Sequence, residues 1–300
     1  MTRLIGPEVE DRLDWLSLTR ALAEGHERPP AEVRDSFIQK DGKTLLTRSA
    51  WIDGLGIAVK VATVFPENPA AGKPAVGGVM SLLSDADGAL EAVIDFHLVT
   101  KWKTAGDSLL AATRLARPDS RNILIVGAGT VGQSLRQAYG AAFPEARFTL
   151  WNRSAEGAER FRATNPDIEI ATDLETAVAQ ADIVTVATMA KEPVIRGDWL
   201  RPGQHIDLIG AFTPEMREAD DTALQRARIF VDSRETVMGH IGELAIPLAS
   251  GAIDEAAVLA DYRDLGAFRR ESDEEITLFK NGGGAHLDLM TGRYILDAAG

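Results

Sequence analysis

A glycine-rich turn between an apolar strand and a helix is the segment with the clearest chemistry. Residues 123–126 run directly into Gly127-Ala128-Gly129-Thr130-Val131-Gly132, and a helix-compatible segment follows at once. In such a strand–turn–helix unit, the first glycine permits a tight turn and the second lets the backbone approach a pyrophosphate, while the third allows close packing. The N–H groups of the first helical turn then face phosphate charge. The pattern predicts a dinucleotide-binding site over residues 127–132.

The end of the next predicted strand bears on the choice of dinucleotide. An NAD-preferring site carries an acid about 20 residues past the glycine-rich turn, and this chain has Asn152 and Arg153 there. A carboxylate would repel a 2′-phosphate, whereas the Arg153 guanidinium can form two hydrogen bonds with it. The sequence therefore favours NADP(H) as cofactor, with NAD(H) as the alternative. A solvated arginine in an exposed turn is the other interpretation of Arg153.

Basic side chains in apolar surroundings are the next candidates for chemistry. Lys60 lies in the apolar run 57–64, where an unpaired ammonium would be costly, so we expect a buried partner or a bound ligand. The alternative is an edge-strand lysine that faces water. Arg48, flanked by small and aromatic residues, either meets a second substrate carboxylate or is an exposed strand arginine.

Metal chemistry has little support in the sequence. The chain has no cysteine, and its histidines (His26, His97, His205, His240 and His286) include no pair at the i, i+4 spacing of a helical metal site. We therefore predict no metal.

The predicted elements fall into two patterns. An amphipathic helix over residues 8–25 precedes an antiparallel meander from Thr44 to Asp95, and Thr100 can cap a helix that continues to Ala116. Beyond Asn122, strands alternate with helices, which predicts a parallel sheet and hence an α/β fold. A last helix, 285–296, follows three glycines. The expected strands are Ile123–Val126, Phe148–Trp151, Ile168–Ile170, Ile183–Ala187, His205–Ile209 and Ile229–Val231.

Charge and hydropathy exclude several classes of partner. The 300 residues hold 45 acidic and 32 basic side chains, and a formal net charge of -13 repels nucleic acid and anionic lipid. No stretch approaches the roughly 20 apolar residues that cross a bilayer, and the first residues lack the apolar run of a signal peptide. We expect a cytoplasmic protein that binds neither nucleic acid nor membrane.

Several further motifs, in order along the chain, resemble those of the ornithine cyclodeaminase/mu-crystallin family. The resemblance implies a Rossmann NAD(P)-binding domain over 118–280 and an α+β substrate-binding and dimerisation domain formed by 1–117 plus 281–300. It also implies a homodimer built through the β-rich part, and it adds Thr104, Ala187, Thr188 and Gly210 to the cofactor site. The matching motifs are Lys60-Val61 with 65–69, Thr104-Ala105, Gly127-Ala128-Gly129, Trp151-Asn152-Arg153, Ala187-Thr188, Gly210-Ala211 with Pro214 and Glu218, Val231-Asp232-Ser233, and Ile276-Thr277 with Phe279-Lys280.

The same resemblance suggests how a substrate would be held. Family members act on small α-amino, α-imino or α-keto acids beside a nicotinamide, and basic side chains bind the substrate carboxylate. By motif these are Arg34, Lys60 and Lys103 in this chain. Lys103 replaces a common arginine, so a point charge stands where a bidentate guanidinium would be.

A second departure from the family concerns acid–base chemistry. Cyclodeaminases carry an aspartate where this chain has Phe212, and a phenyl ring can neither accept nor donate a proton. We expect Phe212 to contact the substrate, and we expect Glu215 and Glu218 to lie in a solvent-facing turn.

The sequence thus favours an NAD(P)H-dependent reductase of small imino acids, of the ketimine or 1-pyrroline-2-carboxylate type, or the reverse amino-acid dehydrogenase. Under this hypothesis Arg34 and Lys103 bind the substrate carboxylate, and Lys60 polarises or protonates the imine. The alternatives are an ornithine cyclodeaminase, which forms proline and ammonia, and a non-catalytic NADPH-dependent binding protein of the mu-crystallin type.

Overall fold

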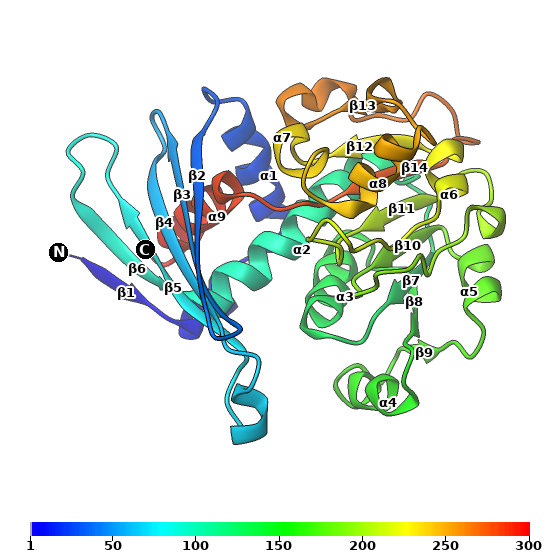
Figure 1. Ribbon diagram of the computed structural model, residues 1–300, viewed down its shortest axis with the longest axis horizontal. Coiled ribbons are helices and arrows are strands. Elements are labelled where there is room, and N and C mark those ends of the chain that lie inside the picture. The colour runs from blue at the N-terminus through cyan, green and yellow to red at the C-terminus, as the bar shows by residue number, and fades with distance from the viewer. Residues whose placement is uncertain (1) are drawn as a thin grey trace. The chain divides into compact units, whose positions relative to one another are not determined.

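The computed structural model describes residues 2–300 and groups them into two units (Figure 1). The first unit comprises the chain up to Lys103 together with Gly284–Gly300, and the second comprises Thr104–Gly283. The first boundary falls inside helix α2 (Phe96–Leu115), where no loop or change in composition marks it. For this reason the observed boundaries differ from the predicted ones at 117/118 and 280/281.

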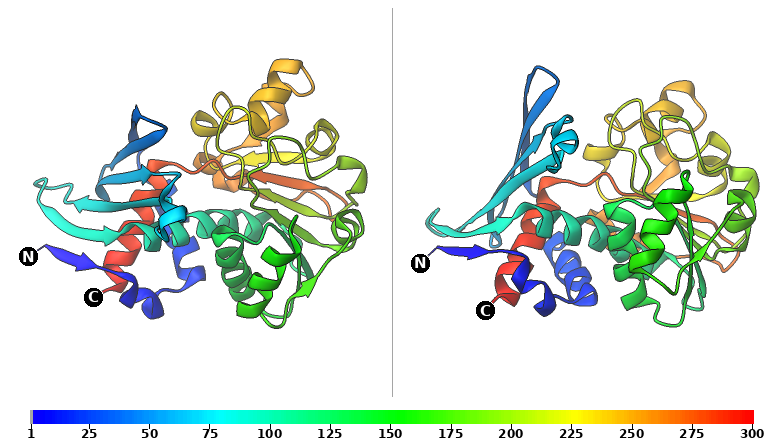
Figure 2. Two further views of the ribbon diagram at one scale, coloured as in Figure 1. Left: turned by 60° about the horizontal axis from the view of Figure 1, so that its bottom comes forward. Right: turned by 90° about the horizontal axis from the view of Figure 1, so that it is seen from below.

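The first unit is a six-stranded sheet with helices on one face. The strand order is β1-β6-β5-β4-β3-β2, and all pairs are antiparallel except β1 with β6. Along β4 the side chains alternate between buried and half-buried, because α9 packs against one face of the sheet, and α1 packs in turn against α9 (Figure 2). The elements are β1 (Arg3–Ile5), α1 (Trp15–His26), β2 (Glu32–Lys40), β3 (Lys43–Ile52), β4 (Gly56–Val64), β5 (Val76–Leu83), β6 (Leu90–Asp95) and α9 (Ala285–Ala298), with 3-10 turns at Pro7–Arg12 and Asn68–Ala71.

Two helix starts differ from the prediction because acidic side chains cap them. The predicted opening helix over 8–25 is a short 3-10 turn followed by α1, whose first turn is capped by Asp14 through a 2.7 Å bond from Ser17 N. Helix α2 begins at Phe96 rather than after Thr100, and Asp95 Oδ1 accepts a bond from Leu98 N at 2.8 Å.

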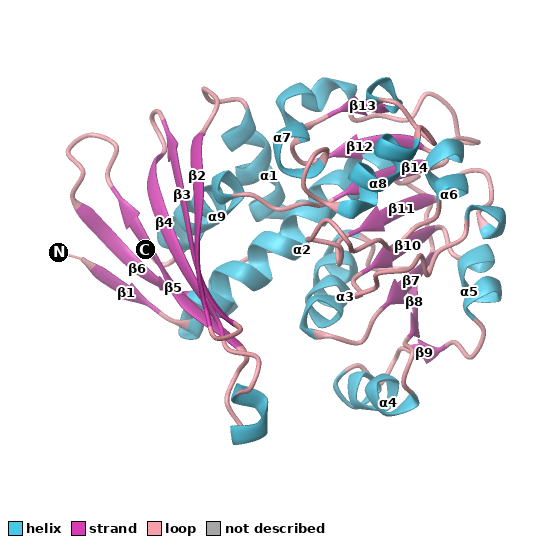
Figure 3. Ribbon diagram, viewed as in Figure 1, coloured by secondary structure: helices cyan, strands magenta, loops and turns pink. Residues whose placement is uncertain are grey.

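The second unit is an eight-stranded, entirely parallel sheet with helices on both faces (Figure 3). Its strand order is β13-β12-β14-β11-β10-β7-β8-β9, so the predicted α/β class with a Rossmann-like domain is confirmed. The strands are β7 (Asn122–Val126), β8 (Arg147–Trp151), β9 (Glu169–Ile170), β10 (Ile183–Val186), β11 (His205–Leu208), β12 (Arg228–Val231), β13 (Val258–Ala260) and β14 (Thr277–Lys280). The helices are the second part of α2, α3 (Thr130–Ala142), α4 (Ala155–Thr164), α5 (Leu174–Gln180), α6 (Asp221–Arg226), α7 (Arg234–Val237) and α8 (Gly242–Ser250), with 3-10 turns at Gly197–Trp199, Glu255–Ala257 and Tyr262–Ala267.

The burial of these strands explains why they could be predicted from the sequence. The strands β7, β10 and β11 are buried almost throughout, as expected for a parallel sheet covered on both faces. None of the helices between residues 2 and 300 has the length and apolar composition needed to cross a membrane.

Candidate functional site

The glycine-rich turn in the second unit has the geometry that a dinucleotide requires. Gly127 has a φ of 115°, and a Cβ there would lie 2.5 Å from the Ala187 carbonyl oxygen. A Cβ on Gly132 would collide with the carbonyl oxygen of Gly127, so helix α3 approaches the strand closely. A Cβ on Gly129 would meet nothing within 4 Å, which leaves that backbone open to a ligand. The three glycines therefore serve a turn, a close packing contact and an open approach.

The strand order places this turn at the point where the order reverses. After β7 the chain moves through α3 to β8 on one side, whereas β10 lies on the other side of β7. A crevice opens at the carboxyl ends of strands where the order reverses in this way. Ala187 and Thr188 follow β10, and Gly210 comes just after β11, so they lie at the same edge as the glycine-rich turn. Thr104 lies on α2, and its carbonyl oxygen accepts a 3.0 Å bond from Asn281 Nδ2.

Asn152 and Arg153, which follow β8, differ in role: Asn152 binds the backbone, whereas Arg153 is exposed. Asn152 Oδ1 accepts a bond from Ala128 N at 3.0 Å, and its Nδ2 donates to Ser154 O at 2.9 Å, so this side chain ties the strand end to the glycine-rich turn. The Arg153 side chain is exposed. Within residues 2–300 it is engaged in no hydrogen bond or ion pair, and it is therefore available to a phosphate.

Glu218 contradicts the expectation of a solvent-facing turn, because it is fully buried. Its Oε1 accepts bonds from Thr188 N at 2.7 Å and Thr188 Oγ1 at 2.8 Å, and its Oε2 accepts one from Gly210 N at 2.6 Å. Burial and the neighbouring Glu243 raise the pKa of Glu218 to about 7. One carboxylate thus joins the loops that follow β10 and β11.

Two further buried charges support these loops. Glu243 accepts bonds from the backbone N–H groups of Glu218 at 2.8 Å and Ala219 at 2.9 Å. Lys280 Nζ donates to three carbonyl oxygens, those of Leu208 at 3.1 Å, Ala211 at 2.8 Å and Asn281 at 2.8 Å. The loop fixed in this way carries Phe212, whose side chain is 59% exposed. Sequence reasoning missed this support, although an isolated acid in the apolar segment 241–248 was a signal for Glu243.

In the first unit, Lys60 is buried and paired. It lies on β4, and its Nζ donates to Asp288 Oδ1 of α9 at 2.8 Å. The ammonium also lies 4.9 Å from the centre of the Phe96 ring, a cation–π contact. Burial lowers the pKa of Lys60, and the Asp288 charge opposes that shift. Sequence reasoning expected a partner or a ligand for Lys60 without identifying Asp288.

The strand register decides which arginine accompanies Lys60. Arg48 of β3 lies directly opposite Lys60 and opposite Asp35 of β2, so the three side chains share the face covered by α9. Arg48 donates two hydrogen bonds to Asp35 Oδ2, from Nη2 at 2.8 Å and from Nε at 3.0 Å. Arg34 pairs with Ser49 and is exposed, and its side chain projects from the opposite face. The structure therefore brings Arg48, and not Arg34, to the side of Lys60.

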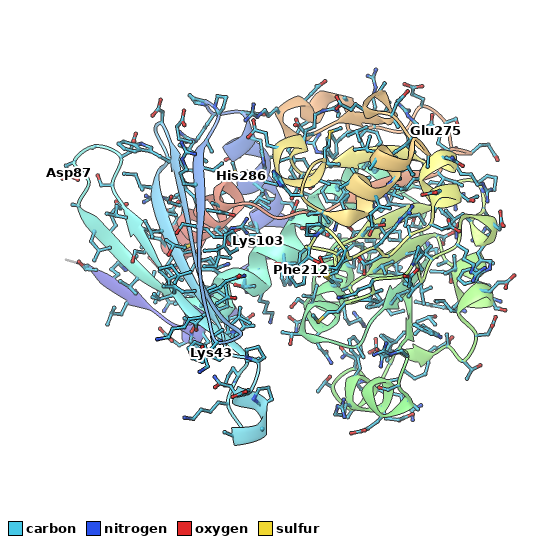
Figure 4. All side chains as sticks on the ribbon, viewed as in Figure 1. Lys43, Asp87, Lys103, Phe212, Glu275 and His286 are labelled. Atoms are coloured by element: carbon cyan, nitrogen blue, oxygen red, sulfur yellow. The ribbon has the colours of Figure 1, made fainter. Side chains whose placement is uncertain are left out.

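Lys103 and His286 complete this cluster (Figure 4). Lys103 is buried on α2, and its charge lowers the pKa of both Lys60 and Asp288. His286 of α9 packs edge-on against the His26 ring, with the ring centres 5.5 Å apart. Burial, followed by the charges of His26 and Lys103, lowers the pKa of His286 to about 3, so its imidazole is neutral near pH 7.

The cationic cluster, defined as Arg48, Lys60, Lys103, Asp288 and His286, carries more positive than negative charge. Its three cations face the buried carboxylate of Asp288 and, through Arg48, the more exposed carboxylate of Asp35, which leaves one positive charge in excess in a protein whose net charge is -13. A buried excess of positive charge suits an anionic ligand group such as a carboxylate. Within residues 2–300, no group of three or more His, Asp or Glu side chains could hold a metal ion.

Comparison with known proteins adds a family and three relatives. Residues 21–300 match the model of the ornithine cyclodeaminase/mu-crystallin family. A Delta(1)-pyrroline-2-carboxylate reductase of Paracoccus denitrificans is 53% identical over 292 residues, which is 95% of this chain and 92% of that protein.

Two solved structures are similar over nearly the whole chain. Thermococcus litoralis Delta(1)-pyrroline-2-carboxylate reductase, in complex with NADH and L-proline, has a TM-score of 0.90 and 27% identity over 99% of this chain and 97% of that one. An archaeal alanine dehydrogenase dimer with bound NAD has a TM-score of 0.89 and 26% identity over 99% of this chain and 96% of that one.

Proposed function

The chain belongs to the ornithine cyclodeaminase/mu-crystallin family, and from this premise we propose that it reduces the cyclic imine Δ1-pyrroline-2-carboxylate to proline. It is a nicotinamide-dependent oxidoreductase that acts on carbon–nitrogen bonds of small imino or amino acids. The observation that carries the proposal is the buried Lys60 ammonium within the cationic cluster. This group can protonate an imine while neighbouring cations bind the substrate carboxylate.

The residues at the carboxyl edge of the parallel sheet fit the cofactor. The open backbone at Gly129 and the first turn of α3, with Thr130 and Val131, would hold the pyrophosphate. Thr188 and Gly210, joined by Glu218, would line the remainder of the site. When bound, NAD(P)H supplies the hydride that the imine carbon accepts.

Lys60 and its neighbours would perform the rest of the reaction. The Lys60 ammonium donates a proton to the imine nitrogen, and its lowered pKa makes it a stronger acid than an exposed lysine. Lys103 binds the substrate carboxylate as a point charge. Arg48 contributes through its charge, since its guanidinium already binds Asp35.

Phe212 argues against the ornithine cyclodeaminase alternative. No carboxylate stands at position 212, and the nearby Glu218 accepts bonds from backbone N–H groups in the interior. That leaves no acid–base group at the position which the family's cyclodeaminases use. The amino-acid dehydrogenase direction has one specific argument, the structural similarity to an alanine dehydrogenase, and it differs from the proposal only in direction and substrate.

NADPH is our proposed cofactor because Arg153 is exposed and lacks an acidic neighbour at position 152. A guanidinium there favours a 2′-phosphate, although the T. litoralis relative was solved with NADH.

A homodimer and a cytoplasmic location also remain proposals. The face of the first sheet opposite α9 carries apolar side chains that include Ile38, Trp51 and Val79, each more than a third exposed. Apolar side chains gathered on one sheet face are typical of an interface between subunits. The lack of cysteine is compatible with the cytoplasm.

The test is a comparison of substrates under one set of conditions. Δ1-pyrroline-2-carboxylate, an acyclic imine formed from pyruvate and methylamine, and ornithine are each incubated with the protein and NADPH or NAD⁺. We expect steady oxidation of NADPH with the cyclic imine and equimolar formation of proline. Tight binding without turnover would instead favour the mu-crystallin-type binding protein, and ammonia from ornithine would favour the cyclodeaminase.

A further inference from the structure

Asp288 carries a buried oxygen that the protein leaves without a partner. Its Oδ1 accepts the bond from Lys60, but its Oδ2 is buried and receives no hydrogen bond within residues 2–300. The side chain is only 1% exposed. An unpaired carboxylate oxygen in the interior is costly, so a bound donor is the expected remedy.

The surroundings of Asp288 indicate what kind of donor this would be. Lys60 and Lys103 both lie close enough to lower the pKa of Asp288, and together with Arg48 they keep it ionised. An anionic ligand group is attracted to those cations and repelled by the carboxylate. A ligand that suits Oδ2 would therefore present an N–H or O–H group to it and place its anionic part elsewhere in the cluster.

A cyclic imino acid has this distribution of charge, with a carboxylate on the carbon next to the ring nitrogen. The inference rests on the proposed function and deepens it. We propose that Asp288 is the residue that recognises the ring nitrogen of the substrate: it orients the Lys60 ammonium through Oδ1, and it accepts through Oδ2 the N–H that the nitrogen carries once protonated.

The proton and electron balance of this step closes. An N–H bond of Lys60 breaks as the imine nitrogen takes the proton, and the imine carbon takes a hydride from the nicotinamide, which is oxidised. The product is the amine of proline, and neutral Lys60 regains a proton from water. Asp288 stays ionised throughout and stabilises the positive nitrogen before the hydride arrives.

Charges on two other elements also act on Lys60 and enter any pH profile, namely Arg48 on β3 and Lys103 on α2. Behind them, Asp35 of β2 binds Arg48, and His26 of α1 acts on His286, which shares α9 with Asp288. His286 and His26 are common to the native protein and to an Asp288 variant, so a difference between the two reports on Asp288.

The first experiment measures the charge state of Lys60 in Asp288→Asn, which keeps the shape of the side chain. Protein labelled with [ε-13C]lysine is titrated with NADP⁺ present, and the Lys60 signal is assigned by its loss in Lys60→Met. We expect the Lys60 midpoint to fall by about 1–3 pH units in Asp288→Asn, the usual effect of removing an opposite charge at this distance. An unchanged midpoint would overturn the assignment to Lys60, whatever the substrate proves to be.

The second experiment tests the nitrogen contact by ligand binding. L-Proline and tetrahydrofuran-2-carboxylate, in which oxygen replaces the ring N–H, are compared by calorimetry with the protein and NADP⁺. We expect the native protein to favour proline, and we expect Asp288→Asn to reduce that preference by roughly 10- to 150-fold, as for a charge-assisted hydrogen bond. Equal losses for both ligands would overturn the nitrogen contact.

Two further variants distinguish a specific effect of Asp288 from a general effect of the substitution on folding. Asp182→Asn alters a buried aspartate at the amino end of β10, where it accepts bonds from the N–H groups of Arg121 and Asn122, and it should change neither readout. If Asp288→Asn does not fold, Lys60→Met/Asp288→Leu removes both charges of the pair, a change that buried ion pairs commonly tolerate, and it should abolish the preference for proline. A native protein that binds neither ligand and reduces no imine would refute the proposed function, while the Lys60 titration would still test its pairing with Asp288.

Discussion

Arg153→Ala should reduce the affinity for NADPH while leaving that for NADH nearly unchanged. The Arg153 side chain is exposed and unengaged, so its removal breaks no internal contact and should not lower the melting temperature. Hydrogen bonds to charged groups contribute about 1.5–3 kcal/mol. At about 1.4 kcal/mol per factor of ten, this corresponds to a loss of roughly 10- to 150-fold.

The assay is a direct titration of each dinucleotide, followed by the change in nicotinamide fluorescence on binding. Arg147→Ala is the matched control, because Arg147 is an exposed arginine at the amino end of the same strand, β8, away from the glycine-rich turn. Raised ionic strength should weaken NADPH binding more in the native protein than in Arg153→Ala, since salt screens an exposed ion pair. Equal affinities for NADPH and NADH in the native protein, or equal losses for both in Arg153→Ala, would refute the reasoning.

Three further predictions concern the two sites. Lys60→Met should lower kcat/KM for the cyclic imine by two or more orders of magnitude, because the proton donor is lost, while the Kd for NADPH, measured by fluorescence, stays within a factor of two or so. Glu218→Gln should place an NH2 group against backbone N–H donors and weaken dinucleotide binding at least about tenfold. Glu218→Asp should restore less than half of the lost binding free energy. Native dinucleotide affinity in Glu218→Gln, measured by calorimetry, would contradict the role of this carboxylate. Ornithine with catalytic NAD⁺ should release no ammonia in an enzyme-coupled assay of the native protein, because Phe212 cannot exchange a proton, and steady ammonia release would reverse that conclusion.

The parallel sheet could be predicted in detail because its strands depend on local sequence. Buried strands such as Ile123–Val126 are short apolar runs between turn residues, and the observed β7, β8, β10, β11 and β12 match the predicted strands within a residue or two. Strand β14 was not predicted as a strand. It comes late in the chain yet inserts between β11 and β12, a position that depends on tertiary pairing.

The position of Arg34, on the sheet face opposite Lys60, could not be predicted for a specific reason. Strand β2 is exposed along its whole length and rich in charge, so it lacks the apolar alternation that identified its neighbours. The signal that could have found it is Asp41-Gly42, which joins β2 to β3 with φ values of 50° and 71°. A two-residue turn of this kind pairs Lys40 with Lys43 and fixes the register of every pair behind it.

Once that register is known, the strand residues of the cationic cluster follow, because successive residues of a strand point to opposite faces of the sheet. Counting back from the turn sets Arg48 opposite Asp35 and leaves Arg34 on the other face, a result that no motif comparison at position 34 could provide. Strand register does not predict the pairing of Lys60 with Asp288, because the two are 228 residues apart and meet only when α9 packs on the sheet. The sequence does restrict the choice: a buried ammonium needs a counter-charge, and Asp288 is the acid in the first turn of the predicted C-terminal helix. A helix that buries one acid, Asp288, against a strand with one buried lysine leaves few other pairings, and this is why the proposed proton donor and its partner come from distant parts of the chain.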